Sequence, residues 1–317
     1  MNTTIGKDIQ LAAEILRKGG LVAIPTETVY GLAGNALHSE AVLKIYEAKQ
    51  RPRFNPLIIH LPSLDHAVKY VTEIPADALL LAKYFSPGPI SFLLSKSNLV
   101  PDLVTAGSDK VVIRIPSHPM TLELLHMLDF PLAAPSANPS GYVSPVTAAH
   151  VMEGLGGKIG YILDGGTCTV GIESTIVGFD RDEIIIHRLG GITVEDIRNI
   201  AHKEPWLSQF HEHPETPGQF KSHYAPSTPL IVGDVDVLLG SNKDKKVATI
   251  SFRHAYPGVK RNFILSPSGD LHQAAANLFA ALRELDKLEL DLILAERFPD
   301  EGIGMAINDR LSRAGSR

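Results

Sequence analysis

The fold is decided by one stretch of the sequence, Leu21-Val22-Ala23-Ile24-Pro25-Thr26-Glu27-Thr28-Val29-Tyr30-Gly31. Its first four residues are apolar and of strand length, and Pro25 bounds them. Two threonine hydroxyls and a run of backbone N–H groups follow. Because ligands collect at the carboxyl ends of strands in α/β sheets, this loop suits a small polar ligand. A strand-to-helix turn with capping threonines explains the loop equally well when it is taken alone.

Working outward, short apolar runs alternate with amphipathic stretches, which predicts an α/β protein. The further runs of strand length are Leu57–Leu61, Ile90–Leu94, Val111–Ile115, Pro131–Ala134 and Ile159–Leu163. The predicted helices are Asp8–Lys18, Ser39–Gln50 with Ser39 as its N-cap, and Pro75–Phe85. Two later runs, Ser174–Phe179 and Ile184–Arg188, are close enough to form a hairpin, so we expect a mixed sheet.

A boundary is predicted near residue 205. Residues 202–229 contain five prolines and four histidines without a helical or strand period, which indicates a linker or a functional segment. A second α/β pattern then begins, with strands expected at Leu230–Val232, Val247–Phe252 and Asp291–Ala295 and a helix at Asp270–Leu290. We therefore expect a large domain over 1–204, a linker over 205–228 and a small α/β domain over 229–317.

The composition is that of a soluble globular protein, with 44% hydrophobic and 21% charged residues. A net charge of -5 argues against a surface devoted to nucleic acid. No apolar run reaches the roughly 18 residues that span a bilayer, and the first ten residues lack the apolar region of a secretory signal. Cys168 is the only cysteine, so an intrachain disulfide and a cysteine-based zinc site are excluded. We expect a cytoplasmic protein in which Cys168 is a small buried residue.

A basic loop, Lys49-Gln50-Arg51-Pro52-Arg53-Phe54-Asn55-Pro56, follows the second predicted helix. Its prolines limit the entropy lost when the cations are held on a ligand. Arginine offers a fork for phosphate oxygens, and lysine acts as a point charge. The loop therefore indicates a small anionic ligand, with a solvated loop as the alternative.

Two further features indicate polar recognition. The loop Ala134-Pro135-Ser136-Ala137-Asn138-Pro139-Ser140-Gly141 has small side chains that let a ligand approach the backbone, although a tight turn has the same composition. Arg114 lies inside an apolar strand and needs either a carboxylate partner or an anionic ligand. His60 closes another strand, where a satisfied core histidine is the alternative to a ligand-binding one.

The common catalytic motifs are absent. The sequence has no Walker A loop, G-x-G-x-x-G loop after a strand, G-x-S-x-G or H-E-x-x-H. His211-x-His213 has no further fixed ligand, so we expect no protein metal site.

The combination of Lys49-x-Arg51 with Ser136-x-Asn138 is the K-x-R…S-x-N signature, and through it the chain resembles the YrdC-like family of threonylcarbamoyl-AMP synthases. Further segments agree, namely PTETVYGL at 25–32, KQRPRFNPLIIH at 49–60, SPGP at 86–89, VVIRIPSHP at 111–119, APSANPSGYVSP at 134–145 and GIESTIV at 171–177. The P-G…H-Y-A-P pattern at 217–226 and the segment 302–311 are similar to the long, two-domain form. Ser222 and Leu189 stand where many relatives carry arginine and proline.

The resemblance implies a large YrdC-like domain, with a twisted mixed sheet and flanking helices, and a small Rossmann-like domain. It implies an enzyme that converts L-threonine, bicarbonate and ATP into threonylcarbamoyl-AMP and pyrophosphate, the first step in modifying the adenosine next to the tRNA anticodon. A downstream threonylcarbamoyl transferase complex and a weak tRNA contact are the implied partners. A tRNA- or double-stranded-RNA-binding module without catalysis is the alternative, as is a carbamoyl-adenylate enzyme with another acceptor.

The resemblance also implies roles for individual residues. Lys49 and Arg51 are expected to be catalytic. The expected threonine-binding residues are Thr28, His60, Arg114 and Ser174. The expected ATP-binding residues are Arg51, Asn55, Ser136, Asn138, Ser144, Arg188 and Tyr224. Mg²⁺ is expected on the ATP phosphates because no carboxylate cage is evident. The linker is expected to be a lid over the active site.

Overall fold

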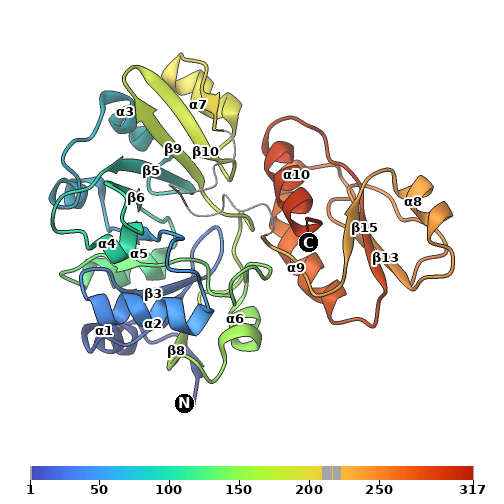
Figure 1. The fold of residues 1–317 in the computed structure, drawn as a ribbon, viewed down its shortest axis with the longest axis horizontal. Helices are drawn as coiled ribbons and strands as arrows, with labels where there is room; N and C mark the ends of the chain where they lie inside the picture. The colour runs from blue at the N-terminus through green and yellow to red at the C-terminus, as the bar shows by residue number, and fades with distance from the viewer. Residues whose placement is uncertain (1, 209–215, 217–222, 317) are drawn as a thin grey trace.

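The computed structural model describes residues 2–208, 216 and 223–316. It has two lobes, each built on its own sheet, with the N-terminus in the larger lobe and the C-terminus in the smaller one (Figure 1). In order across the sheet, the strands of the larger lobe are β1 (Thr4–Gly6), β8 (Tyr161–Leu163), β2 (Val22–Ile24), β3 (Gly31–Asn35), β7 (Leu132–Ala133), β4 (Ile58–His60), β6 (Lys110–Arg114), β5 (Ile90–Ser95), β9 (Thr175–Asp180), β10 (Glu183–Arg188) and β11 (Trp206–Leu207). Parallel and antiparallel neighbours both occur, so the predicted mixed sheet is confirmed.

Helices pack on this sheet and bury its apolar faces. They are α1 (Ile9–Arg17), α2 (Ser39–Lys49), the 3-10 helix η1 (Leu64–Lys69), α3 (Ala76–Phe85), α4 (Asp102–Thr105), α5 (Pro119–His126), α6 (Ala148–Leu155) and α7 (Val194–Ala201). Asp8 caps α1 by accepting a hydrogen bond from the Leu11 backbone N–H. The expected N-cap of α2 is wrong, because Ser39 is already helical and His38 holds the cap position without a side-chain bond.

The polar loop within residues 21–31 connects two antiparallel strands, β2 and β3. β2 pairs with β3 through Ile24 and Gly31, so the alternative of a strand-to-helix turn is wrong. Thr26 stabilises the connection from within, since its hydroxyl accepts from the Thr28 and Val29 backbone N–H groups, each at 3.2 Å. The loop is thereby fixed before any ligand arrives.

The sheet brings the polar segments together. His60 and Arg114 are partners in register at the carboxyl ends of the parallel strands β4 and β6. β7, which leads into the 134–141 loop, runs antiparallel to β4. Loops at both ends of these strands therefore contribute polar groups. In purely parallel sheets, by contrast, the site lies at the carboxyl ends of the strands alone.

The smaller lobe has a fully parallel sheet with the order β12 (Leu230–Val232), β15 (Leu292–Ala295), β13 (Val247–Ser251) and β14 (Arg261–Ile264). Its helices are α8 (Val235–Ser241), α9 (Leu271–Asp286) and α10 (Ile303–Ala314). The predicted small α/β unit is confirmed, although α9 ends four residues before the expected Leu290. Part of the expected linker is also structured, because Trp206–Leu207 pairs with β10 as β11. Residues 209–215 and 217–222 of that linker lie outside the described residues.

Helices α9 and α10 face the larger lobe (Figure 1). Arg283 of α9 is 1% exposed and donates to the Val143, Ser144 and His150 carbonyl oxygens at 2.6, 3.3 and 3.3 Å. At Gly171, where φ is +77°, an added Cβ would lie 2.4 Å from Ala276 Cα. The two lobes are therefore joined by buried polar bonds and close backbone contact.

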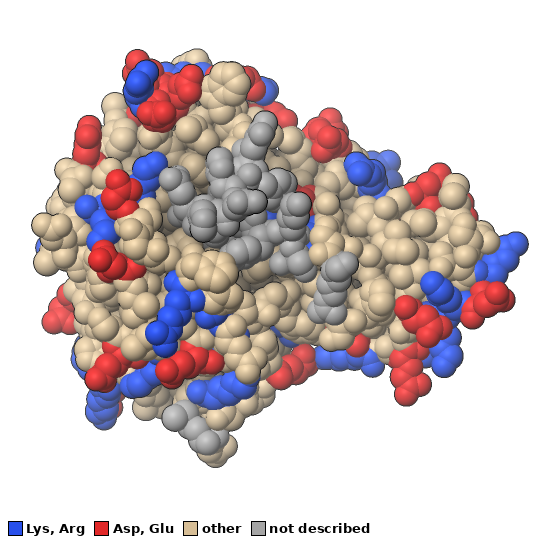
Figure 2. Space-filling view, viewed as in Figure 1, with Lys and Arg blue, Asp and Glu red and all other residues tan. Residues whose placement is uncertain are grey.

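Two further predictions concern burial and surface. Cys168 is buried, as predicted. None of the helices in the described part of the chain is long and apolar enough to cross a membrane. Figure 2 shows acidic and basic side chains intermixed over the visible face of both lobes, outside the grey region.

Candidate active site

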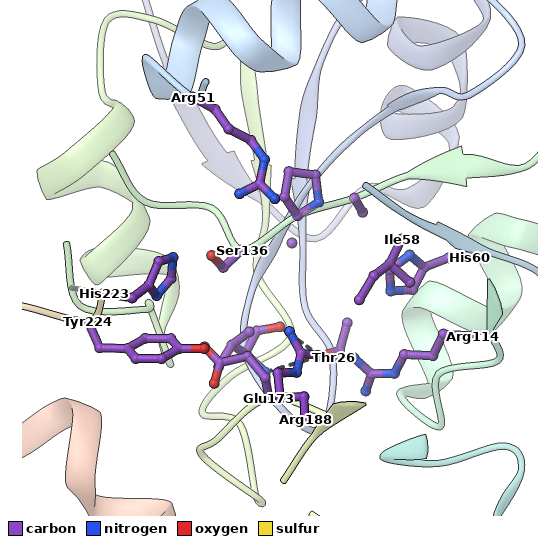
Figure 3. Close-up of a pocket in the computed structure, with 14 residues that line it drawn as sticks. Thr26, Arg51, Ile58, His60, Arg114, Ser136, Glu173, Arg188, His223 and Tyr224 are labelled. Carbon is purple, nitrogen blue, oxygen red and sulfur yellow. Dashed lines mark hydrogen bonds between the residues drawn. The ribbon is translucent and has the colours of Figure 1, made fainter. Parts of the chain in front are cut away.

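One pocket of the larger lobe collects most of the polar segments singled out in the sequence. It is lined by Thr26, Val29, Gly31, Arg51, Ile58, His60, Arg114, Ala134, Pro135, Ser136, Glu173, Arg188, His223 and Tyr224. In Figure 3, Arg51 enters from one side, His60 and Arg114 from another, and His223 and Tyr224 from opposite these two. The space left for the centres of water-sized molecules is about 50 Å³.

Arg51 is a buried cation held in place by its own loop. Its Nε donates to the Asn55 carbonyl at 3.1 Å, and its Nη2 donates to Asn55 Oδ1 at 2.5 Å and to the Pro56 carbonyl at 2.8 Å. Burial lowers the pKa of Arg51 to about 10, which leaves it charged at neutral pH. Asn55 therefore fixes the orientation of Arg51 and does not itself line the pocket.

Lys49 lies behind the pocket wall. Its Nζ donates to the Ser136 and Asn138 carbonyl oxygens, both at 2.5 Å, and the side chain is 1% exposed. Burial and the neighbouring Arg51 hold the pKa of Lys49 well below its ordinary value. The lysine thus ties the basic loop to the Ser136-x-Asn138 loop.

The Ser136–Ser144 segment is ordered by several polar bonds. Ser136 lines the pocket, and Asn138 Nδ2 donates to the Pro139 and Tyr142 carbonyls at 2.9 and 2.8 Å. Asn138 Oδ1 is buried and has no hydrogen-bond partner among the described residues. Ser144 donates to Glu173 Oε1 at 2.6 Å.

Arg188 and Ser174 form the next part of the wall. Arg188 Nε and Nη2 donate to the Ser174 carbonyl and hydroxyl, both at 3.0 Å, and the Ser91 and Ser174 hydroxyls are 2.8 Å apart. Burial lowers the pKa of Arg188 to about 10. Arg188 lines the pocket, whereas Ser174 is fully buried beside it.

Arg114 has a carboxylate partner within the protein. Its Nη2 donates to Glu27 Oε1 at 2.7 Å, and the other oxygen of Glu27 accepts from the Ser117 backbone N–H at 3.1 Å. The neighbouring His60 is neutral, because burial and then Arg114 lower its pKa to about 3. Buried His60 Nδ1 has no partner within the described segments, so it remains able to accept or donate one further hydrogen bond.

The two threonines of the 25–31 loop are placed differently. Thr26 lines the pocket, and the fully buried Thr28 lies behind it with its hydroxyl 2.8 Å from that of Thr26. Sequence reasoning selected Thr28 and passed over Thr26, although both stand in the same polar loop.

Tyr224 closes the pocket from the side of the smaller lobe. It is 1% exposed, has φ of +62°, and stacks on Phe279 with ring centroids 5.5 Å apart. His223 packs edge-on against it at 4.1 Å. The smaller lobe thus supports the aromatic wall of the pocket.

Glu173 is a pocket residue that sequence reasoning missed. It is buried between Ser144 and Arg310 of α10, whose Nε donates to Glu173 Oε2 at 3.0 Å. Burial opposes its ionisation, but Arg310 and Arg188 hold the pKa of Glu173 below its ordinary value. Its position inside the apolar GIESTIV run was the available signal, since a buried charge needs a partner.

Of the expected site residues, the pocket lining includes Arg51, His60, Arg114, Ser136, Arg188 and Tyr224. Thr28, Lys49, Asn55, Asn138, Ser144 and Ser174 are buried around it and outside the lining. Within the described ranges, no three His, Cys, Asp or Glu side chains are arranged to hold a metal ion. The pocket offers several fixed cations, neutral donors and an aromatic wall, a combination suited to phosphate, carboxylate and base.

Comparison with known proteins agrees with this chemistry. Residues 14–190 match the Sua5–YciO–YrdC family model, described as "Telomere recombination", and residues 192–316 match the model described as "Threonylcarbamoyl-AMP synthase, C-terminal domain". The threonylcarbamoyl-AMP synthase of Pyrococcus abyssi is 39% identical over 96% of this chain and 93% of its own length. That of Bacillus subtilis is 38% identical over 98% of this chain and 94% of its own length.

A solved structure agrees over both lobes. The crystal structure of P. abyssi Sua5 complexed with L-threonine has a TM-score of 0.92 and 38% identity, covering 99% of this chain and 97% of that one. With that coverage, the similarity extends over both lobes. The chain therefore belongs to the threonylcarbamoyl-AMP synthase family, in its long form with two domains.

Proposed function

We propose that the pocket described above forms L-threonylcarbamoyl-AMP and pyrophosphate from L-threonine, bicarbonate and ATP. The observation that carries the proposal is the convergence of Arg51, Arg114 and Arg188 on one pocket beside Ser136 and the buried Asn138. Three buried cations suit a substrate pair that brings a triphosphate and an amino-acid carboxylate.

The threonine site is assigned to Arg114, His60, Thr28 and Ser174. Arg114 would bind the carboxylate, and the loop threonines and Ser174 would order the pocket around the side chain. A site that hydrogen-bonds the threonine hydroxyl rejects valine strongly, whereas the missing methyl of serine is worth only about 1–3 kcal/mol.

The nucleotide site is assigned to the remaining residues. Arg51 and Arg188 would supply positive charge for the phosphates. Lys49 would hold the Ser136-x-Asn138 loop against the basic loop, and Asn55 would orient Arg51. Ser136, Asn138 and Ser144 order the loop beside the nucleotide, and Tyr224 would cover it.

The reaction needs positioning and charge stabilisation and no covalent enzyme intermediate. The neutral amine nitrogen of threonine attacks the carbon of carbon dioxide and gives up one proton to water, which leaves a carbamate. From bicarbonate the same attack expels the hydroxyl group, which takes up that proton and leaves as water. A carbamate oxygen then attacks the α-phosphorus of ATP, the bond to the bridging oxygen of the β-phosphate breaks, and pyrophosphate leaves. Arginines fixed around the phosphates stabilise the charge that moves to the leaving group.

Mg²⁺ fits this site only as an ion carried by the substrate. Glu173 of the pocket lining and the nearby Glu27 are both engaged with arginines, and the described residues offer no cage for the ion. The phosphates and water would supply its oxygen ligands, and the ion would neutralise phosphate charge.

We infer a catalytic domain over 1–204, a linker and lid over 205–228, whose first residues add β11 to the large sheet, and a small domain over 229–317. The labile adenylate would pass to a threonylcarbamoyl transferase complex acting on the adenosine next to the anticodon, with at most a weak tRNA contact by this protein. The place of action would be the cytoplasm.

The testing experiment measures pyrophosphate release from ATP and bicarbonate with L-threonine, L-serine, L-valine or no amino acid. Release is expected with threonine, less with serine, and at the background level with valine. Arg51→Met should abolish it, whereas the matched control Arg53→Met, an exposed cation of the same loop, should not. Threonine-independent release would favour a carbamoyl-adenylate enzyme with another acceptor. No release, together with tight RNA binding at low salt, would favour the RNA-binding alternative.

A further inference from the structure

The smaller lobe places one fully buried arginine against the active site. Arg310 of α10 is 0% exposed, and each of its three nitrogens has an acceptor. Nε donates to Glu173 Oε2 at 3.0 Å, Nη1 to Asp309 Oδ2 at 2.9 Å, and Nη2 to the Leu189 carbonyl at 2.8 Å. Its guanidinium carbon also lies 5.2 Å from the centroid of the Tyr224 ring. One side chain of α10 thus contacts the carboxylate and the aromatic wall of the pocket.

Glu173, the carboxylate that Arg310 contacts, lies between two other residues of the site, Ser144 and Arg188. Glu173 lines the pocket, and its other oxygen accepts from Ser144. Arg188, a cation assigned to the phosphates, is close enough to interact electrostatically with Glu173. A carboxylate that turned toward Arg188 would compete with an anionic substrate for that cation.

We propose that Arg310 is a positioning residue of the active site, which holds Glu173 on Ser144 and prevents it from pairing with Arg188. The proposal rests on the proposed function and gives the smaller lobe a direct part in it. Arg310 would act on the nucleotide through Glu173, Ser144 and Tyr224, without touching it. Removing the guanidinium should therefore impair nucleotide use more than overall folding.

Protonation gives a readout that is specific to this arrangement. The charged and titratable groups facing Glu173 are Arg310 of α10, Arg188 of β10, and His223 and Tyr224 of the linker. Burial alone would raise the pKa of Glu173, and the arginines oppose that effect. The ionised carboxylate is the acceptor that holds Ser144, so activity should fall at a pH where Glu173 is protonated. Without Arg310 that protonation should occur at a higher pH, and the acid limb of the pH–rate profile should move upward with it.

The experiment compares the full-length wild type, Arg310→Gln and the double variant Glu173→Gln/Arg310→Gln in the pyrophosphate assay between pH 5 and 9. Arg310→Gln should lower kcat/KM for ATP about 10- to 100-fold at neutral pH, the effect expected for losing a charged hydrogen bond. Its acid limb should move to higher pH, and this shift should vanish in the double variant. Arg261→Gln, which breaks the exposed Arg261–Glu284 pair of the same lobe, is the matched control.

An unchanged acid limb in Arg310→Gln, or the same shift in the double variant, would overturn the proposal. If Arg310→Gln does not fold, Arg310→Lys is compared with the double variant, because the lysine keeps the charge beside Glu173. The acid limb of the pH–rate profile in Arg310→Lys should then match that of the wild type. An acid limb that moved to higher pH in Arg310→Lys would overturn the proposal.

A measurement without substrate separates this inference from the proposed function. Amide hydrogen exchange of the ligand-free protein should be faster over residues 142–146 and 171–175 in Arg310→Gln, and should remain unchanged there in Arg261→Gln. A wild type without pyrophosphate release would refute the proposed function. Exchange that is equal in the two variants would refute the positioning role.

Discussion

The Arg114–Glu27 pair allows the structural and catalytic duties of one arginine to be separated. Both side chains are buried, with 5% and 9% exposure, and their charged atoms are 2.7 Å apart. Arg114→Met would leave the Glu27 carboxylate buried without its main partner, which costs about 3–5 kcal/mol of unfolding free energy. Glu27→Gln/Arg114→Met removes both charges and keeps similar volumes, so most of that stability should return.

Activity should behave differently from stability. The double variant still lacks the cation assigned to the threonine carboxylate, and a charged hydrogen bond is worth roughly 1.5–3 kcal/mol. The KM for threonine should therefore remain about 10- to 150-fold above the wild-type value, as measured by pyrophosphate release at varied threonine. Urea unfolding followed by circular dichroism reports the stability of each variant. A double variant that regains both stability and threonine affinity would show that Arg114 serves only the fold.

Three further predictions test the interface, the motif lysine and a histidine. Gly171 has φ +77°, and a Cβ added there would lie 2.4 Å from the α9 backbone, so Gly171→Ala should lose about 2–4 kcal/mol of unfolding free energy in urea. Gly157 has φ +80° but open space around it, so Gly157→Ala should lose only about 1–2 kcal/mol. Equal losses in the two variants would contradict the close contact at Gly171. Lys49→Met should lower the unfolding free energy by about 2–5 kcal/mol, because two carbonyls in the 136–138 loop lose their donor. A variant that keeps wild-type stability but no longer releases pyrophosphate would instead show that the ammonium group contacts the substrate. His60 has a pKa of about 3 in the folded protein and 6.5 ordinarily, so the unfolding free energy should fall as the pH drops below 6.5, by at most about 1.4 kcal/mol per pH unit. Urea unfolding between pH 7 and 4 should show a weaker pH dependence of that free energy in His60→Gln. The same pH dependence in His60→Gln and the wild type would refute this assignment.

Apolar patterning predicted most of the central strands because they are buried on both faces. Ile58–His60 and Lys110–Arg114 are examples in which the run of branched residues marks the strand within one or two residues. β3 escaped prediction, because its sequence Gly-Leu-Ala-Gly-Asn is poor in residues that favour strands and is held by pairing with β2 and β7. Local propensity was overridden there by tertiary contact.

The site was predictable where its residues occur in compact motifs. Arg51 and Ser136 belong to short signatures, and both line the pocket. Glu173 and Arg310 were not selected, although both stand in segments that resemble the family. Their ion pair joins positions 137 residues apart, and no local pattern reveals which buried charges will meet. The functions of Lys49 and Asn55 as internal braces likewise follow only from the three-dimensional contacts.

The two buried arginines of α9 and α10 have a consequence for how the chain matures on the ribosome. Arg283 supplies the donors for the Val143, Ser144 and His150 carbonyls, and Arg310 supplies the partner of Glu173. All four acceptors are translated more than a hundred residues before these donors. Since N-terminal domains generally fold first during synthesis, the nascent large lobe would keep these groups hydrated until both helices have emerged. Competence for catalysis would then arise late in translation, when the smaller lobe docks.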